Sequence, residues 1–205
     1  MMEVRDTMSE MMSSIKEVSL RRATVADAEA IAAVRVESWQ TTYRGMIPDS
    51  YLDEMRIEDS FLHWKTVLEA LPTAGDRACV YVAESEGHII GFASGMLLER
   101  AKHGFTAELS AVYLRPAWQR SGIGRRMVQK VARTLQAQGA QNLLVWLISG
   151  NNVARNFCEE LGAEFILEQE FSWDGVDLKE SGYGWRDLSV LLASVQAMPT
   201  SAAIH

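Results

Sequence analysis

The spacing of hydrophobic residues predicts helices in the first third of this chain. After Thr24, a residue suited to capping a helix, apolar residues recur at intervals of three or four positions. The stretch that follows carries Gly45 and Pro48, lacks this spacing and predicts a loop. Helical spacing resumes over residues 57–70, and the helix is expected to stop at Pro72.

Alternation with a period of two residues then predicts strands. Two of them are joined by the turn Ser-Glu-Gly-His, which indicates a hairpin. A later segment, Leu-Leu-Val-Trp-Leu-Ile, is wholly apolar, as is typical of a strand buried on both faces. The predicted strands cover residues 18–23, 79–83, 88–97, 107–114 and 143–148, with two more near residues 164–171 and 183–190.

Two further helices separate the later strands. One runs from Gly122 to about Gln138 and places an apolar residue at every fourth position. The other covers residues 151–161, with Gly162 as its C-terminal cap. Hairpins that precede a strand–helix–strand crossover predict the α/β fold class with a mixed sheet.

The composition indicates one globular domain. The chain has 205 residues, of which 48% are hydrophobic and 23% are charged. We expect the domain to span residues 18–190, with residues 1–17 as a mobile tail and residues 191–205 as a frayed end. The first residues mix both charges and lack the apolar core of a signal peptide, and no apolar run approaches the length of a membrane span.

Charge and cysteine content narrow the partners and the compartment. The formal net charge of −7 argues against nucleic-acid binding and mildly favours cationic partners. Two cysteines, Cys79 and Cys158, do not suggest a disulfide framework, which fits a reducing cytoplasm. The spacing of His63, His88 and His103 indicates no metal site.

Positive charge surrounds one glycine-containing segment, QRSGIGRRM, at residues 119–127. Between Arg115 and Arg133 there are six Lys or Arg residues and no Asp or Glu. The segment joins a predicted strand to a predicted helix, and a helix N-terminus presents free N–H groups and partial positive charge. Gly122 and Gly124 let the main chain approach a ligand closely. These features predict a phosphate-binding site, although a structural turn with a helix cap would have the same spacing.

Two familiar nucleotide-binding loops do not fit these residues. A P-loop requires Gly-Lys followed by Ser or Thr, whereas this loop has Gly-Arg-Arg at residues 124–126. A Rossmann loop requires a third glycine where Met127 stands, and an acidic residue at the end of the next strand, which LLVWLI lacks.

Two motifs, in order and each preceded by a strand, resemble those of the GNAT superfamily of acyl-CoA-dependent N-acyltransferases. The first is Q-x-x-G-x-G at residues 119–124, which resembles the pyrophosphate-binding motif of that family. The second is N-x-x-A-x-x-F at residues 151–157, followed by Leu-Gly. The resemblance covers roughly residues 18–190. It implies a mostly antiparallel sheet with a splayed parallel strand pair, helices on both faces, and acetyl-CoA as cosubstrate between the splayed strands.

The resemblance also implies the cofactor contacts. The strand before the loop would pair with the pantetheine arm, the loop N–H groups would hold the pyrophosphate, and Asn151 would contact the arm. Ala154 and Phe157 would pack beside it, although an apolar helix stripe accounts equally well for Phe157. Arg126 and the loop arginines either contact the ribose phosphate or face water. The implied cofactor-binding residues are Val112, Tyr113, Leu114, Gln119, Arg120, Ser121, Gly122, Ile123, Gly124, Arg125, Asn151, Ala154 and Phe157.

The implied reaction, attack of a neutral amine on a thioester, needs a proton acceptor and benefits from a proton donor. Glu108 lies where several GNAT enzymes place a carboxylate base, and an ordinary exposed strand-end glutamate is the alternative. Cys158 stands where family members often carry a donor tyrosine, so it is either the donor or a buried core residue. Tyr113 and Tyr183 are other candidate donors. The branch that acetylates ribosomal proteins has a glutamate at the position of Trp146, which disfavours that branch.

The acceptor side resembles GNAT proteins of unassigned substrate in the segments ESWQTTYRGMIPDSYLDEM and GYGWRDL. By this resemblance Trp39, Tyr43 and Trp185 line the acceptor pocket, and Glu37 or Asp49 attracts a cationic amine. The alternative is that these aromatic residues only pack helices onto the sheet.

The sequence therefore predicts a cytoplasmic enzyme that transfers an acetyl group directly from acetyl-CoA to a primary amine of a small molecule or peptide. No metal, nucleic acid or membrane is expected to take part, and homodimer formation stays open. The alternative from another class is a non-catalytic acyl-CoA-binding sensor or structural module with the same fold. An acyltransferase acting on aminoacyl-tRNA would need a broad positive face, which the composition argues against.

Overall fold

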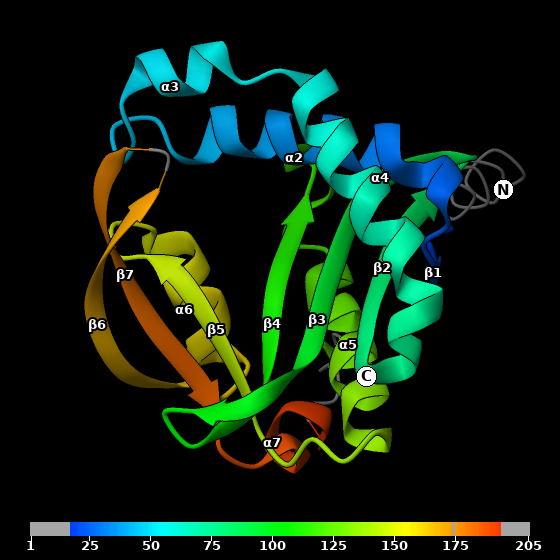
Figure 1. The fold of residues 1–205 in the computed structure, drawn as a ribbon, viewed down its shortest axis with the longest axis vertical. Helices are drawn as coiled ribbons and strands as arrows, with labels where there is room; N and C mark the ends of the chain where they lie inside the picture. The colour runs from blue at the N-terminus through cyan, green and yellow to red at the C-terminus, as the bar shows by residue number, and fades with distance from the viewer. Residues whose placement is uncertain (1–16, 174, 194–205) are drawn as a thin grey trace, which may run out of the picture.

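The computed structural model describes residues 17–173 and 175–193, which form one sheet with helices on both faces (Figure 1). In this described part the sheet has seven strands in the order β1-β2-β3-β4-β5-β7-β6. Neighbouring strands are antiparallel except β4 and β5, which run parallel, so the predicted mixed sheet is confirmed. The strands are β1 (Ser19–Arg22), β2 (Ala78–Ser85), β3 (His88–Lys102), β4 (Phe105–Leu114), β5 (Leu143–Ile148), β6 (Glu164–Trp173) and β7 (Val176–Trp185).

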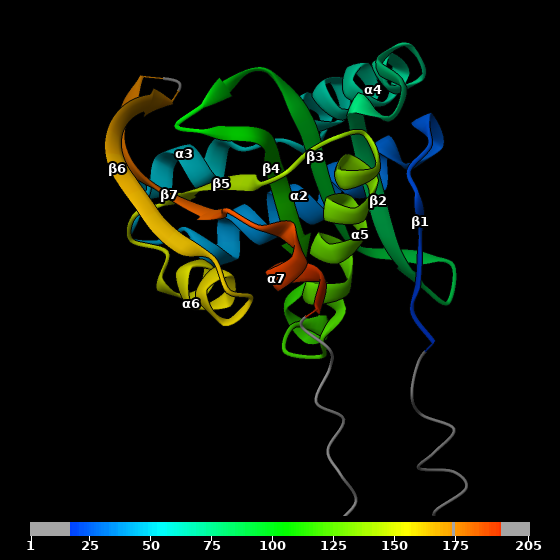
Figure 2. The ribbon, with the colours of Figure 1, turned by 90° about the horizontal axis from the view of Figure 1, so that it is seen from below.

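Helices cover the two faces of the sheet separately (Figure 2). On one face, α2 (Ala28–Thr42) and α4 (Ile57–Ala74) pack on β2 and β3 around a core that includes Phe92. On the other face, α5 (Ile123–Ala137) packs along the sheet, with α6 (Asn152–Glu160) and α7 (Leu188–Ala193) beside it. The core under α5 buries one apolar helix stripe, as the spacing predicted. That stripe is Ile123, Met127, Val128, Val131, Ala132 and Leu135.

Helix boundaries near two prolines differ from the expected ones. The short helix α3 (Asp49–Glu54), which begins directly after Pro48, was not predicted. Helix α4 was expected to stop at Pro72, but it continues through this residue to Ala74. A proline this close to a C-terminal end removes a single main-chain hydrogen bond from the helix, so the last turn still forms.

The last predicted strand, near residues 183–190, overlaps β7 (Val176–Trp185) only at residues 183–185 and is wrong for the rest. Strand β7 ends at Trp185, and residues 188–190 form the first turn of α7. The Asp187 carboxylate accepts a hydrogen bond from the main-chain N–H of Ser189 at 2.8 Å, which is a helix-capping contact. Leu188 and Leu191 are buried at helical spacing.

The predicted tails lie largely outside the described residues. Of the expected mobile tail at residues 1–17, the structure describes residue 17 alone. Of the expected frayed end at residues 191–205, residues 191–193 complete α7, and residues 194–205 lie outside the described part.

A bulge and a divergence open the sheet between β4 and β5. Gly95 pairs with Leu109 and the preceding residue of β3 pairs with Ala111, so Ser110 is an extra residue in β4. The parallel pairing of β4 with β5 is limited to Glu108 with Leu144 and the residue pair that follows. Beyond that point the two strands diverge, and no strand among the described residues pairs with this edge of β4.

The bulge also reverses which side chains of β4 face each core. Before it, Ala107 and Leu109 pack in the core under α5. After it, Val112 and Leu114 pack on that side, whereas Ala111 and Tyr113 pack toward α2 and α4. Glu108 alternates with the residues under α5 and therefore points to the α2 side of the sheet.

Candidate active site

The loop between β4 and α5 has the geometry of an anion-binding nest. Its backbone adopts positive φ at Arg120 (61°) and Gly122 (80°), and the helix begins at Ile123. In the described structure the N–H groups of residues 120–125 donate to no protein acceptor. The first helical hydrogen bond runs from Arg126 N to Gly122 O at 3.1 Å. The loop therefore presents several unpaired main-chain donors at the positive end of a 15-residue helix.

Two side chains stabilise this loop from within. Gln119 Nε2 donates to the carbonyl of Leu114 at 3.0 Å, and Ser121 Oγ donates to the carbonyl of Trp118. Both contacts use side-chain groups and leave the N–H groups of the loop available. These two contacts thus stabilise the conformation that presents those donors.

The arginines around the loop have different surroundings. Arg126 donates to the main-chain carbonyl of Val18 at 3.0 Å, so its guanidinium is attached to the start of β1. Arg115 forms an ion pair with Glu37 at 2.8 Å. Arg120 is exposed and Arg125 is partly exposed, and both stay candidates for a phosphate contact.

The second sequence motif lies directly beside the loop. A Cβ placed on Gly124 would lie 3.4 Å from the ring of Phe157, so the first turn of α5 packs against α6. Asn151 is 5% exposed and caps α6, with its Oδ1 accepting from Ala154 N at 3.0 Å. The two segments singled out in the sequence, far apart along the chain, are therefore neighbours in the fold.

Buried aromatic residues bridge the diverging strands. Trp39 Nε1 donates to the Tyr113 hydroxyl at 2.9 Å, and the Tyr43 hydroxyl interacts with both Tyr113 and Asn151. Burial, with a smaller contribution from Tyr113, raises the pKa of Tyr43 far above its usual value of 10, whereas the Asn151 interaction lowers it. Asn151 thus acts as a donor to the Tyr43 oxygen. This network joins α2, the β4 end and the α6 cap.

The predicted acceptor-pocket residues do not share one wall. Trp39 and Tyr43 are 7% and 8% exposed and pack with Ile47 and Leu52 under α3. Trp185 is 1% exposed, lies in the core under α5 and donates from Nε1 to the Leu161 carbonyl at 2.9 Å. The prediction of Trp185 as a pocket residue is therefore wrong, because its position along β7 points its side chain toward α5.

Glu108 is half-buried on the α2 side of the sheet, one residue before the strands diverge. Burial raises the pKa of its carboxyl group, Lys102 opposes this rise, and the negative charge of Glu180 adds to it. A carboxylate with a raised pKa at a strand divergence is suited to accept a proton near neutral pH.

Cys158 and Tyr183 both point into the core under α5. Cys158 is 2% exposed, and burial raises the pKa of its thiol to about 12. Tyr183 is 5% exposed and packs edge-on against Phe165, and burial raises its pKa as well. These surroundings favour the interpretation of Cys158 as a buried core residue.

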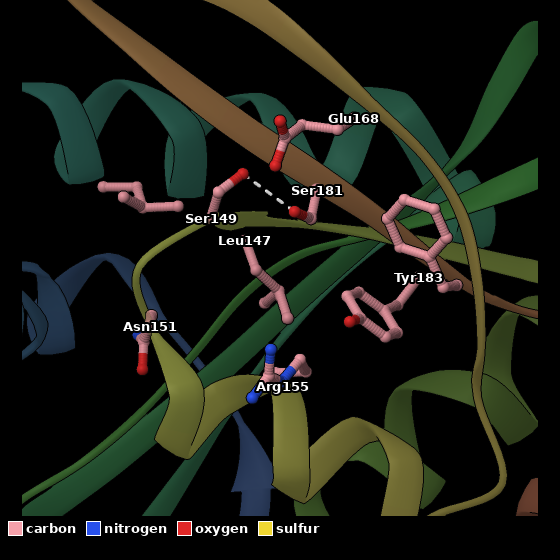
Figure 3. Close-up of a pocket in the computed structure, with 9 residues that line it drawn as sticks. Leu147, Ser149, Asn151, Arg155, Glu168, Ser181 and Tyr183 are labelled. Carbon is pink, nitrogen blue, oxygen red and sulfur yellow. Dashed lines mark hydrogen bonds between the residues drawn. The ribbon is translucent and has the colours of Figure 1, made fainter.

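A small cavity on the α6 side was not foreseen from the sequence. It has a volume of about 170 Å³ and lies between α6 and strands β5, β6 and β7 (Figure 3). The hydroxyl groups of Ser149 and Ser181 meet at 2.8 Å on one wall, and Arg155 and Glu168 border it. Its lining includes no residue of β4, but it includes Asn151 and the end of β5.

Two negative findings concern the described residues alone. Within residues 17–173 and 175–193, no three His, Cys, Asp or Glu side chains gather as metal ligands would. In the same ranges, no helix has both the length and the apolar character needed to cross a bilayer.

A mixed sheet with one diverging parallel pair, followed by a glycine loop at a helix N-terminus, defines an acyltransferase-like fold. The family model of the acetyltransferase (GNAT) family matches residues 34–163, and the chain belongs to this family. It is 36% identical over 175 residues to the uncharacterized N-acetyltransferase YuaI of Bacillus subtilis, covering 85% of this chain and 96% of that one. These matches confirm the resemblance found in the two motifs.

Two more distant relatives come from Thermoplasma acidophilum. Spermidine N(1)-acetyltransferase is 21% identical over 163 residues, which cover 75% of this chain and 98% of that protein. The crystal structure of PaiA N-acetyltransferase in complex with coenzyme A matches with a TM-score of 0.63 at 20% identity, covering 80% of this chain and 98% of that one. At this identity the structural match confirms the fold.

Proposed function

We propose that this protein is an N-acetyltransferase that moves an acetyl group from acetyl-CoA directly to a primary amine. The observation that carries the proposal is the row of N–H groups at residues 120–125 that find no acceptor among the described residues, beside an edge of β4 with which no described strand pairs. A diphosphate would accept hydrogen bonds from the loop. The pantetheine arm would pair with the main chain of Val112, Tyr113 and Leu114 as an added strand.

The family to which the chain belongs supports acetyl-CoA as the acetyl donor, and the PaiA relative is a complex with coenzyme A. In this proposal Gln119 and Ser121 hold the loop open, while Asn151 contacts the pantetheine arm through its remaining amide hydrogen. Ala154 and Phe157 pack beside the arm. The anionic cofactor explains why an acidic protein keeps a basic segment here.

Glu108 is the proposed base. An alkylammonium with a pKa near 10.4 costs about 4–5 kcal/mol to deprotonate at pH 7, and a carboxylate at the strand divergence accepts that proton directly or through water. The amine nitrogen then attacks the thioester carbon, and a main-chain N–H beside the β4 bulge stabilises the oxygen as it gains charge. The carbon–sulfur bond breaks, coenzyme A leaves as a thiolate, and the attacking nitrogen releases its second proton to solvent as the amide forms.

Release of free thiol from acetyl-CoA tests the proposal directly. The purified chain is incubated with acetyl-CoA and a panel of alkylamines, aromatic amines and short basic peptides. Sustained thiol release that depends on one class of amine, with the acetylated amine identified by mass, is the expected result. Tight binding of acetyl-CoA with no release for any amine would contradict an enzymatic function.

Such an outcome would favour the second candidate, a non-catalytic acyl-CoA-binding module. The specific observation behind it is Cys158, because this buried thiol stands where family members often carry a donor tyrosine. A thiol with a pKa of about 12 is a poor donor to a departing thiolate, whose conjugate acid has a pKa near 8.5. In our proposal the thiolate leaves without help from this residue.

Replacing Cys158 with alanine tests that point. We expect kcat to change less than about twofold, because the thiol donates no proton, while the free energy of unfolding falls by about 1–2 kcal/mol from the small cavity. Steady-state kinetics and urea unfolding check the two expectations. Cys79→Ala is a matched control, since Cys79, on β2, is equally buried in the core under α5, away from the loop. A fall in kcat of a hundredfold would restore Cys158 as the donor.

Replacing Tyr43 with phenylalanine tests whether the buried network orients Asn151. Loss of the hydroxyl leaves the Asn151 amide less fixed, so we expect coenzyme A binding to weaken by about three- to tenfold. Calorimetric titration with coenzyme A gives the affinity. Tyr81→Phe is the control, because it also removes one buried hydroxyl contact, the 2.8 Å bond to Thr134, far from the loop. Equal affinities in both variants would contradict the role of Tyr43.

A further inference from the structure

The tip of the β3–β4 hairpin crosses β5 and β7 at one end of the sheet (Figure 1). There the Lys102 ammonium lies 4.7 Å from the ring centroid of Trp146, and the His103 ring packs edge-on against the same indole at 5.8 Å. Phe105, at the start of β4, packs on Gly184, where an added Cβ would lie only 2.3 Å from its ring. A primary alkylammonium of the chain itself therefore occupies the face of an aromatic ring.

Trp146 belongs to the same side of the sheet as Glu108. Within β5, Val145 packs in the core under α5 and Leu147 packs against it, so Trp146 between them faces the α2 side. Leu144, two residues earlier on β5, is the register partner of Glu108. The indole therefore lies along β5 at the level where β4 and β5 begin to diverge.

A second carboxylate reaches this side from β7. An added Cβ on Gly182 would lie 3.1 Å from the Trp146 ring, so Gly182 lies beneath the indole, and Glu180, two residues away, shares its face. Glu180 Oε1 accepts a hydrogen bond from Gln169 Nε2 at 2.7 Å, which fixes the carboxylate. Its charge acts on Glu108, as does the charge of Lys102, so the three groups lie within electrostatic range of one another.

The indole also carries an unused donor. Trp146 Nε1 is buried and has no hydrogen-bond partner within the described residues. A buried N–H without a partner is costly, which favours a polar ligand beside this indole.

We propose that Trp146, Glu108 and Glu180 form the acceptor subsite, that it takes a primary alkylammonium ion, and that Lys102 occupies it until the acceptor arrives. This inference rests on the proposed acetyl transfer and narrows its acceptor class. The aromatic face and the two carboxylates attract the ammonium of a linear amine. That amine displaces the Lys102 ammonium, gives one proton to Glu108 and forms the new nitrogen–carbon bond as the carbon–sulfur bond to coenzyme A breaks. The nitrogen releases its second proton to solvent as the amide forms.

Glu180→Gln is the principal test, because it removes the charge and keeps the shape. With 1,4-diaminobutane as acceptor, we expect the amine KM to rise by about tenfold or more, while the acetyl-CoA KM stays within about twofold. Glu168→Gln is the matched control, since Glu168 is the neighbouring carboxylate that borders the cavity on the opposite face of the sheet. An unchanged amine KM in Glu180→Gln would overturn the proposal.

Lys102→Met gives an effect of the opposite sign. Removal of the competing ammonium is expected to lower the KM for 1,4-diaminobutane by about threefold or more, and an unchanged or higher value would overturn the proposal. Trp146→Leu is expected to raise the KM for 1,4-diaminobutane. A general loss of folding does not lower a KM. The Lys102 variant therefore keeps the test decisive even where the Trp146 variant is unstable.

Direct binding separates this inference from the proposed reaction. Calorimetric titration of 1,4-diaminobutane into the wild-type chain saturated with coenzyme A needs no turnover. Binding that is lost in Glu180→Gln supports the subsite even where no thiol is released, and in that case the proposed reaction alone fails. Thiol release with an amine KM that Glu180→Gln does not change refutes the subsite and leaves the reaction standing.

Discussion

Replacement of Gly124 with glutamate is expected to abolish coenzyme A binding. Gly124 lies in the first turn of α5, where the N–H groups of residues 120–125 have no protein acceptor. A glutamate side chain there brings bulk and a negative charge into the space that a diphosphate would occupy. Loss of the charge-assisted hydrogen bonds and direct repulsion predict a fall in affinity of at least about a hundredfold, measured by calorimetric titration.

Gly124→Ala is the control that separates the effects of charge and bulk on coenzyme A binding from an effect on folding. An added Cβ would make an ordinary contact of 3.4 Å with the Phe157 ring, so alanine fits. In a helix, alanine is favoured over glycine by about 0.5–1 kcal/mol, and the alanine variant is therefore expected to be at least as stable as the wild type. Unchanged coenzyme A affinity in the folded glutamate variant would show that the loop is not the diphosphate site.

Replacement of Glu108 with glutamine is expected to lower kcat by about a hundred- to ten-thousandfold at neutral pH, because the proton acceptor is removed. The deficit should shrink as the pH rises toward the amine pKa near 10.4, where solvent supplies the neutral amine. Since burial raises the Glu108 pKa, the wild-type rate should fall on acidification at a higher pH than the usual 4.5 of a glutamate. Rate–pH profiles of both proteins give the measurement.

The same substitution has an expected effect on stability with a defined sign. A raised pKa means that the folded protein binds the Glu108 proton more tightly than the unfolded chain does. Ionisation of this carboxyl group lowers the free energy of unfolding. This loss is absent below the pKa that the group has in the unfolded chain, grows as the pH rises through its pKa in the folded protein and is constant above that pKa. Glu108→Gln should thus be more stable than the wild type at neutral pH and equal to it in acid.

The exposed Glu160, on the far end of α6, offers a control for charge alone, and Glu160→Gln should change neither the rate profile nor this stability difference. A Glu108→Gln enzyme with a wild-type rate profile would remove Glu108 from the mechanism. Equal stability of Glu108→Gln and the wild type at all pH values would contradict the raised pKa of Glu108. The catalytic role of Glu108 would then be decided by the rate profiles alone.

The cofactor side of the fold was predictable because its signals are local. The motif at residues 119–124 combines turn, helix start and charge in six consecutive positions, and the fold forms the expected turn and helix start there. The bulge at Ser110 had no signal in the sequence. It depends on the pairing of β4 with β3, which the order of residues in one strand does not specify.

The proposed acceptor side was predicted less well because its residues meet through long-range packing. Alternation along β7 sends Trp185 toward α5 and the glycines toward the opposite face, and the sequence alone does not say which face is which. The contact of Lys102 with Trp146 joins a hairpin tip to a strand more than forty residues later. Trp146 was noted in the sequence only as a departure from one branch of the family.

A crystal structure of the chain with acetyl-CoA tests the central claim most directly. The account predicts the diphosphate on the main-chain N–H groups of residues 120–125, with the pantetheine arm along β4 and the thioester beside the bulge at Ser110. A cofactor bound elsewhere, for example in the cavity under α6, or a loop whose N–H groups are filled by the protein's own side chains, would contradict it.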